Sequence, residues 1–122
     1  MANLNGGRPT EGAPEINFNY EIVLAIANEG HTDTVMEAAR EAGARGGTVL
    51  HGKGTGSTDA AKFFGVSIAS EKEVIMIVAK SSEKAAIMKS IIDKAGTQTD
   101  AGAVVMSLPV SAVAGFGMLD NN

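Results

Sequence analysis

Two short apolar runs constrain the fold most, because each places hydrophobic side chains on both of its faces. Residues 20–27 read YEIVLAIA, and residues 73–79 read EVIMIVA. Runs of this length and composition are typical of strands buried on both sides. In the first run Val23 and Leu24 belong to opposite faces, as do Ile75 and Met76 in the second. The sequence therefore predicts a sheet with two apolar faces.

Two further strands are predicted at 48–53 and 103–107, and two helices lie between the strands. The first helix is expected to begin at Thr32 or at Thr34, which has capping-box spacing to Glu37, and to end at Gly43. Its buried face is predicted to be Val35, Met36, Ala39 and Ala42. The second helix is expected to begin at Ser81 or Ser82, with Glu83 in its first turn, and to end at Gly96. Its buried face is predicted to be Ala85, Met88, Ile91, Ile92 and Ala95.

This order of elements, β-α-β-β-α-β, predicts an α+β ferredoxin-like (split βαβ) fold. In that fold two helices cover one face of a four-stranded antiparallel sheet. With 122 residues, of which 44% are hydrophobic, we expect one domain at 20–119 after a flexible tail at 1–19. Because the uncovered face is also apolar, we expect an obligate oligomer.

Composition and charge exclude several classes of function. The net charge of −4, without a cluster of Lys and Arg, argues against nucleic-acid binding. There is no cysteine to supply a disulfide, a thiolate ligand or a nucleophile. The start of the chain lacks the pattern of a signal peptide, so we expect a cytoplasmic protein. Residues 101–119 are uncharged, but Pro109 and three glycines favour a buried strand and a packed turn over a membrane span.

A glycine-rich segment, GARGGTVLHGKGTG at 43–56, approaches two phosphate-binding motifs without matching either. Gly54 stands where a Walker A loop needs Ser or Thr, and the spacing Gly52-x-Gly54-x-Gly56 differs from a dinucleotide fingerprint. We interpret these glycines as the junction between a strand and a loop. The backbone N–H groups from Gly54 to Ser57 could form an anion-binding nest, or the glycines could only shape the turn.

The segments EAAREAGARGGTVLHGKGTG, EVIMIVA and AGAVVMSLPVSAV, in this order over residues 20–113, resemble the PII nitrogen-regulatory signalling family. The resemblance implies a homotrimer with sheets facing inward, an adenine nucleotide in each cleft between subunits, and control of a transporter or enzyme through the loop at 54–64. The implied ligand-binding residues are Thr48, Lys53, Gly54, Thr55, Gly56 and Ser57 from one subunit, with Thr97, Gln98, Thr99, Asp100 and Gly102 from its neighbour.

The chain departs from the family pattern where phosphates would bind. The segment DAGAVV at 100–105 lacks the family's lysine, and AGFG at 114–117 lacks its arginines. Since a charge-assisted hydrogen bond contributes about 1.5–3 kcal/mol, ATP affinity should fall by orders of magnitude. The cofactor therefore stays open, either an adenine nucleotide or another small anion. The loop at 54–64 also lacks a tyrosine, so tyrosyl uridylylation is excluded there.

Two alternatives stay open at this point. One is a trimeric interaction module that binds no ligand, which the missing lysine and arginines favour. The other is a metal-binding trimer, which rests on His31, His51 and scattered carboxylates, a weak set for zinc. No nucleophile–base pair is evident in the sequence, so we do not expect an enzyme.

Overall fold

The computed structural model describes residues 19–55 and 70–115, and its elements follow the predicted order. They are β1 (Tyr20–Asn28), α1 (Thr32–Glu41), β2 (Thr48–Gly54), β3 (Ser70–Lys80), α3 (Lys84–Ala95) and β4 (Val104–Pro109). The predicted α+β class and the β-α-β-β-α-β arrangement are confirmed.

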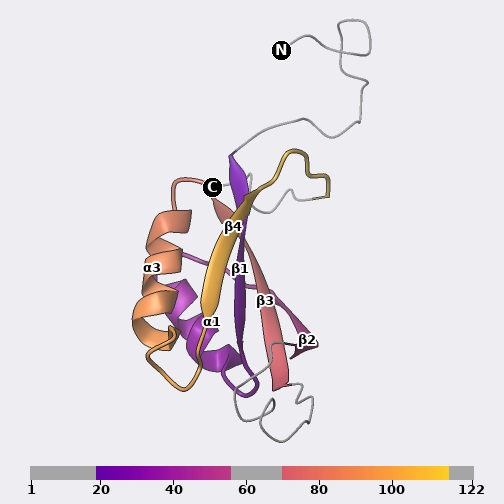
Figure 1. Cartoon of the computed structure of the whole chain (residues 1–122). Helices are drawn as coiled ribbons and strands as arrows, with labels where there is room; N and C mark the ends of the chain where they lie inside the picture. Colours follow the sequence, from indigo (N-terminus) through magenta and orange to yellow (C-terminus); the bar gives the residue numbers. More distant parts are fainter. Residues whose placement is uncertain (1–18, 56–69, 116–122) are drawn as a thin grey trace, which may run out of the picture.

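The four strands form one antiparallel sheet in the order β2-β3-β1-β4. The two central strands, β1 and β3, are the two runs that are apolar on both faces. Figure 1 shows α1 and α3 together on one side of this sheet. The helices therefore cover one face, as the split βαβ plan requires.

The core lies between the helices and the sheet. Its largest fully buried side chains come from both layers: Val23, Ile75 and Ile77 from the strands, and Val35, Ile87 and Ile91 from the helices. The small residues Ala25, Ala27, Ala38 and Ala39 are also fully buried there, and they allow the two layers to approach closely.

The opposite face of the sheet, called the open face below, is covered by no described element of the chain. The strand registers place ten apolar side chains on it: Ile22, Leu24, Ile26, Leu50, Val74, Met76, Val78, Val104, Met106 and Leu108. Leu50 and Val104 are each 51% exposed, Leu108 is 47% exposed and Met106 is 40% exposed. The predicted second apolar face is therefore present. The expectation of a buried fourth strand is wrong for a single chain, because one side of β4 is open.

The predicted cap of the first helix is wrong. The helix begins at Thr32, and its N-cap residue His31 makes no side-chain capping bond. Thr34 lies inside the helix, so it cannot form a capping box with Glu37. The Thr32 hydroxyl instead donates to Oε1 of Glu73 on β3, 2.8 Å away. A carboxylate from a distant strand thus replaces the local cap. The end was predicted correctly, since Ala42 is the C-cap and Gly43 follows with φ of +112°.

The second helix also differs in its start and in its buried face. It begins at Lys84, after a turn at 81–83, and its N-cap residue Glu83 makes no side-chain capping bond. The predicted serine caps are therefore wrong. Ala85 and Ile92 are exposed, whereas Ile87 is fully buried. The buried stripe is turned because α3 packs on both α1 and the sheet, and the helical period alone does not fix that direction.

Boundaries differ slightly elsewhere. Gly54 closes β2 and is not yet loop, and β4 extends to Pro109. All but the last residue of the predicted tail at 1–19 lies outside the described ranges. So do most of the loop at 54–64, the extended arm at 63–68 and the last residues of the C-terminal turn. Among the described helices, none is both long and apolar enough to cross a membrane.

Candidate functional site

The candidate site is centred on Lys72, a residue of β3 that the sequence analysis did not single out. Lys72 is paired in register with Asn28 of β1 and with Gly52 of β2, so it shares the open face with Val74. Its ammonium Nζ donates to the side-chain Oδ1 of Asn28 over 2.6 Å. A cation therefore lies at one end of the apolar set on this face, and Lys80 is in register at the other end.

Gly54, at the end of β2, lies beside this lysine. A Cβ atom built on Gly54 would come within 3.0 Å of Lys72 Cε and 2.9 Å of Ser70 Oγ. The absence of a side chain at Gly54 is what lets the lysine stem pass across the strand. The predicted glycine junction and Lys72 are thus brought together by the pairing of β2 with β3.

The loop that follows α3, residues 97–102, reaches the same end of the sheet through Asn28. The backbone N–H of Asn28 donates to the Ala101 carbonyl over 2.8 Å, and its side-chain Nδ2 donates to the Asp100 carbonyl over 3.0 Å. Gly102 has φ of +57°, in the left-handed region that favours glycine. The predicted loop residues Asp100 and Gly102 therefore adjoin Asn28, the partner of Lys72, within a single chain.

Two other predicted residues of this loop are engaged in the turn itself. Thr99 donates from its hydroxyl to the Gly96 carbonyl over 2.8 Å, and Gln98 donates from Nε2 to the Ile92 carbonyl over 2.9 Å. These side-chain bonds add to backbone bonds on the same carbonyls, since the Gly96 N–H donates to the Ile92 carbonyl and the Thr99 N–H donates to the Gly96 carbonyl. The Gln98 amide keeps a second N–H and its oxygen for a ligand, whereas a hydrogen bond donated by the Thr99 hydroxyl to a ligand would have to replace its bond to Gly96. The Thr97 side chain is exposed.

The predicted β2 residues are not all on the same side of the sheet. Lys53 is paired with Glu71, and its Nζ lies 3.6 Å from Glu71 Oε1. By strand alternation both belong to the face opposite Gly54 and Lys72. Thr48 begins β2 opposite Met76, six residues from Gly54 and about 20 Å away at strand spacing. Thr55 is exposed, and Gly56 and Ser57 lie outside the described residues.

A buried carboxylate lies on the helix side of the same strand ends. Oε1 of Glu73 accepts hydrogen bonds from the Gly30 and His31 backbone N–H groups at 3.1 and 3.2 Å, in addition to the Thr32 hydroxyl. The Thr32 bond is the main cause that lowers the pKa of Glu73. Burial opposes it, and the two backbone bonds and His51 lower the pKa further. Glu73 therefore stays ionised and fixes the turn between β1 and α1.

The histidines of the metal hypothesis both adjoin this carboxylate. His51 Nδ1 lies 3.9 Å from Glu73 Oε2, and His31 contacts Glu73 through its backbone. Within residues 19–55 and 70–115, no three His, Cys, Asp or Glu side chains gather as a metal site would require. The observed contacts are a backbone bond at the helix start and a contact between an imidazole and a carboxylate at the strand edge.

Sequence reasoning missed Asn28, Lys72 and Glu73, although one signal was available. Lys72 occupies the same alternating set as Val74, Met76 and Val78, so it is a charged residue in register with an apolar face. Lysine is seldom buried unless it is paired, so a lysine in that set points to a partner, although Lys80 at the other end of the strand shares the pattern. The partner, Asn28, is 44 residues away in the sequence, which no local pattern reveals.

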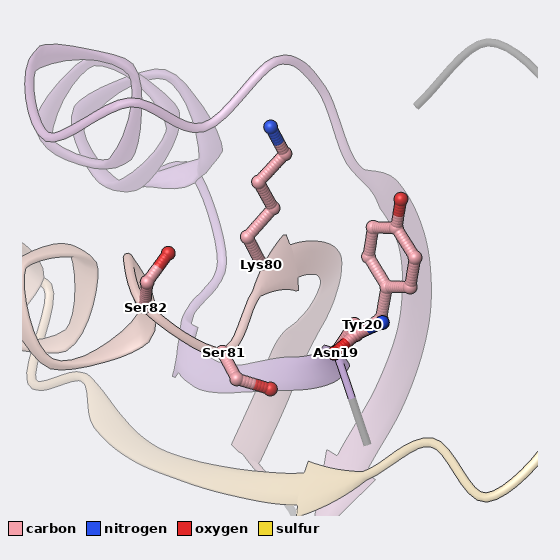
Figure 2. Close-up of a pocket in the computed structure, with 5 residues that line it drawn as sticks. All are labelled: Asn19, Tyr20, Lys80, Ser81 and Ser82. Atoms are coloured by element: carbon pink, nitrogen blue, oxygen red, sulfur yellow. The ribbon is translucent and has the colours of Figure 1, made fainter. Parts of the chain in front are cut away.

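A separate cavity of about 360 Å³ lies at the other end of the sheet. It is lined by Asn19, Tyr20, Lys80, Ser81 and Ser82. Figure 2 shows the Tyr20 and Lys80 side chains extending in the same direction from adjacent strand ends. None of the predicted ligand-binding residues lines this cavity, so it is distinct from the candidate site.

Comparison with known proteins agrees with this architecture. The family model described as nitrogen regulatory protein P-II matches residues 20–116. Among solved structures, the chain is similar to an Arabidopsis thaliana PII bound to citrate, with a TM-score of 0.61 and 24% sequence identity over 78% of each chain. At that identity the likeness concerns the fold. No curated relative matches the chain by sequence.

Proposed function

Because the chain belongs to the nitrogen regulatory protein P-II family, we propose that it is a homotrimeric regulatory protein that binds a small anion between subunits. An adenine nucleotide is the second ligand class, as in the family resemblance. The partner, a transporter or an enzyme, would be contacted through the loop at 54–64. We assign no catalytic role, and we place the protein in the cytoplasm with its regulatory domain at 20–119.

The observation that carries this proposal is the lysine at the end of the open face. The Lys72 ammonium bonds to a neutral amide oxygen, and among the residues that the structure describes it forms no ion pair. An incoming anion would compete with this neutral oxygen for the ammonium, because charge-assisted bonds to an anion are the stronger ones. Gly54, which lies beside it, adds no side chain of its own to this approach. The segment DAGAVV at 100–105 lacks the lysine of the family pattern. Lys72 on β3 would supply a cation to the site in its place.

The charge of the site favours a small ligand over a triphosphate. Among the described residues, Lys72 is the cation that approaches Gly54, while Lys53 is on the other face beside Glu71. One lysine suits a carboxylate or a single phosphate better than ATP, whose three phosphates demand several cations. The similar Arabidopsis PII is bound to citrate, which by analogy supports an anionic ligand.

The open face supports the proposed oligomer. A continuous set of ten apolar side chains, several of them half exposed, is larger than soluble monomers usually leave uncovered. Sheets of three copies facing inward would bury these side chains. The end of each face, with Lys72 and Gly54, would then lie at the rim of the subunit interface, where a neighbouring chain completes the cleft.

Thermal unfolding with a ligand panel tests the binding proposal. The panel holds citrate, inorganic phosphate, bicarbonate, ADP and ATP, and calorimetry follows each shift. A ligand at 100 times its Kd should stabilise the protein by about 2.7 kcal/mol. Lys72→Met should abolish the shift, whereas Lys80→Met, at the other end of β3, should retain it. A wild-type protein that responds to none of these compounds would instead favour an interaction module without a ligand.

A further inference from the structure

Asn28 joins three segments that are far apart in the sequence. It is the last residue of β1, and its side-chain oxygen accepts the bond from Lys72 on β3. Its side-chain nitrogen donates to the Asp100 carbonyl, 72 residues along the chain. Its backbone N–H donates to the Ala101 carbonyl. One amide group thus contacts both the candidate cation and the loop at 97–102.

The chemistry of the two partners fixes the orientation of this amide. An ammonium can only donate, and a carbonyl oxygen can only accept, so Oδ1 must face Lys72 and Nδ2 must face Asp100. The amide is planar, and any rotation that weakens one of these bonds also weakens the other. The position of Lys72 and the position of the loop are therefore linked by a rigid group.

The loop is shaped to receive this amide. A Cβ atom on Gly102 would come within 3.0 Å of Asn28 Nδ2, so a larger residue there would displace the side chain. The loop backbone is further held by the Gly102 N–H, which donates to the Thr99 carbonyl over 3.1 Å. Loosening Asn28 should therefore be detectable at the Gly102 amide, which Lys72 is not seen to contact.

We propose that Asn28 is a positioning residue that couples Lys72 to the loop at 97–102. When Lys72 is held, the Asn28 amide is fixed and the loop is held with it. When the ammonium turns toward an anion, the amide loses its charged partner and the loop is released. The coupling can be measured without a ligand, although its use in signalling rests on the proposed function.

Amide hydrogen exchange measured by NMR on the full chain tests the coupling. Lys72→Met should raise the exchange rate of the Gly102 amide about tenfold, as expected for loss of a charge-assisted bond. Asn28→Ala should raise it by a similar factor. Because both changes break the same link, the double variant should exchange no faster than Asn28→Ala alone. The Ile77 amide, in the middle of β3, reports global unfolding, and rates at Gly102 are compared after normalising to it.

A conservative variant separates the two halves of the amide. Asn28→Asp keeps an oxygen for Lys72 but removes the donor to Asp100, so it should release the loop even though the lysine stays held. Lys80 lies at the other end of β3 from Asn28, so Lys80→Met should leave the exchange rate of the Gly102 amide unchanged. The inference is overturned if Lys72→Met leaves the Gly102 rate at the wild-type value, or if the two single effects multiply in the double variant.

Titration with inorganic phosphate then distinguishes this inference from the proposed function. If phosphate binds, it should raise the exchange rate of the Gly102 amide in the wild type. In Asn28→Ala phosphate should leave that rate unchanged. A rate that still responds to phosphate in Asn28→Ala would contradict the coupling. If phosphate and the rest of the panel fail to bind while the double-variant cycle is non-additive, the coupling stands and the ligand proposal fails.

Discussion

Glu73 shows how one buried side chain can define a local structure that the nearby sequence does not encode. Its residue surface is 7% exposed, and one carboxylate oxygen accepts three hydrogen bonds from the turn that starts α1. The helix consequently needs no capping side chain of its own. A charged acceptor is also favoured there by the positive end of the helix dipole.

Replacing this carboxylate should destabilise the fold. Glu73→Gln keeps the size of the side chain but removes its charge, which weakens all three bonds. We expect a loss of about 1–3 kcal/mol in the free energy of unfolding at pH 7, measured by urea denaturation. Glu71→Gln, a half-exposed neighbour on the same strand, should change the stability by less than about 0.5 kcal/mol. Equal effects of the two variants would contradict the assigned role.

The pH dependence of stability should also reflect the ionised Glu73 carboxylate. The pKa of Glu73 is lowered in the folded state from its ordinary value of 4.5, chiefly by the Thr32 hydroxyl. A lowered pKa stabilises the fold above the unfolded value, and that contribution disappears as the pH falls through the folded value. The wild type should therefore lose its higher free energy of unfolding relative to Glu73→Gln below pH 4.5. Urea denaturation from pH 7 to pH 3 measures this difference. An advantage that persists unchanged at pH 3 would disagree with this assignment.

Gly102 is the glycine at which a side chain should matter most for the candidate site. Its φ of +57° and its approach to Asn28 both disfavour a Cβ atom. Gly102→Ala should cost about 1–2 kcal/mol in urea denaturation. Gly46→Ala is the control, because Gly46 has no positive φ and no atom within 4 Å of a built Cβ. A neutral Gly102→Ala would show that the loop adopts another conformation.

At the scale of elements, α3 shows what helical periodicity leaves undetermined. The pattern identified a helix and its end at Gly96, yet it assigned Ile91 and Ile92 to the same buried face. The structure buries Ile91 completely and leaves Ile92 38% exposed. Packing on two neighbours selects the stripe, and Ser90 contributes by donating to the Ala38 carbonyl of α1 over 2.6 Å.

Alanine replacements at these adjacent residues should therefore differ strongly. Ile91→Ala should cost about 2–4 kcal/mol, because it leaves a cavity between the helices and the sheet. Ile92→Ala should cost less than about 1 kcal/mol. Chemical denaturation of the two variants side by side makes the comparison, and similar losses would mean that α3 is rotated from the position described.

At the scale of the whole molecule, the apolar open face should control assembly. Met106→Lys places a charge in the middle of that face, so it should convert a trimer to monomers in sedimentation velocity experiments. Ile92→Lys makes the same change at a similarly exposed residue, 38% against 40%, but on the helix side of the molecule. It should leave the trimer intact. A wild-type monomer, or a trimeric Met106→Lys variant, would refute the assembly proposed from the open face.

The sequence by itself determined the class and order of elements in this protein, because two-sided apolar strands and helical periods are local patterns. It also indicated the second apolar face and the glycine at the β2 boundary. Only the tertiary structure decided where the ends of those elements meet. Lys72, Asn28 and the loop at 97–102 are brought together by strand pairing across 44 and 72 residues, and Glu73 reaches α1 from another strand. Such contacts depend on how distant strands are paired, and a short stretch of sequence does not encode that pairing.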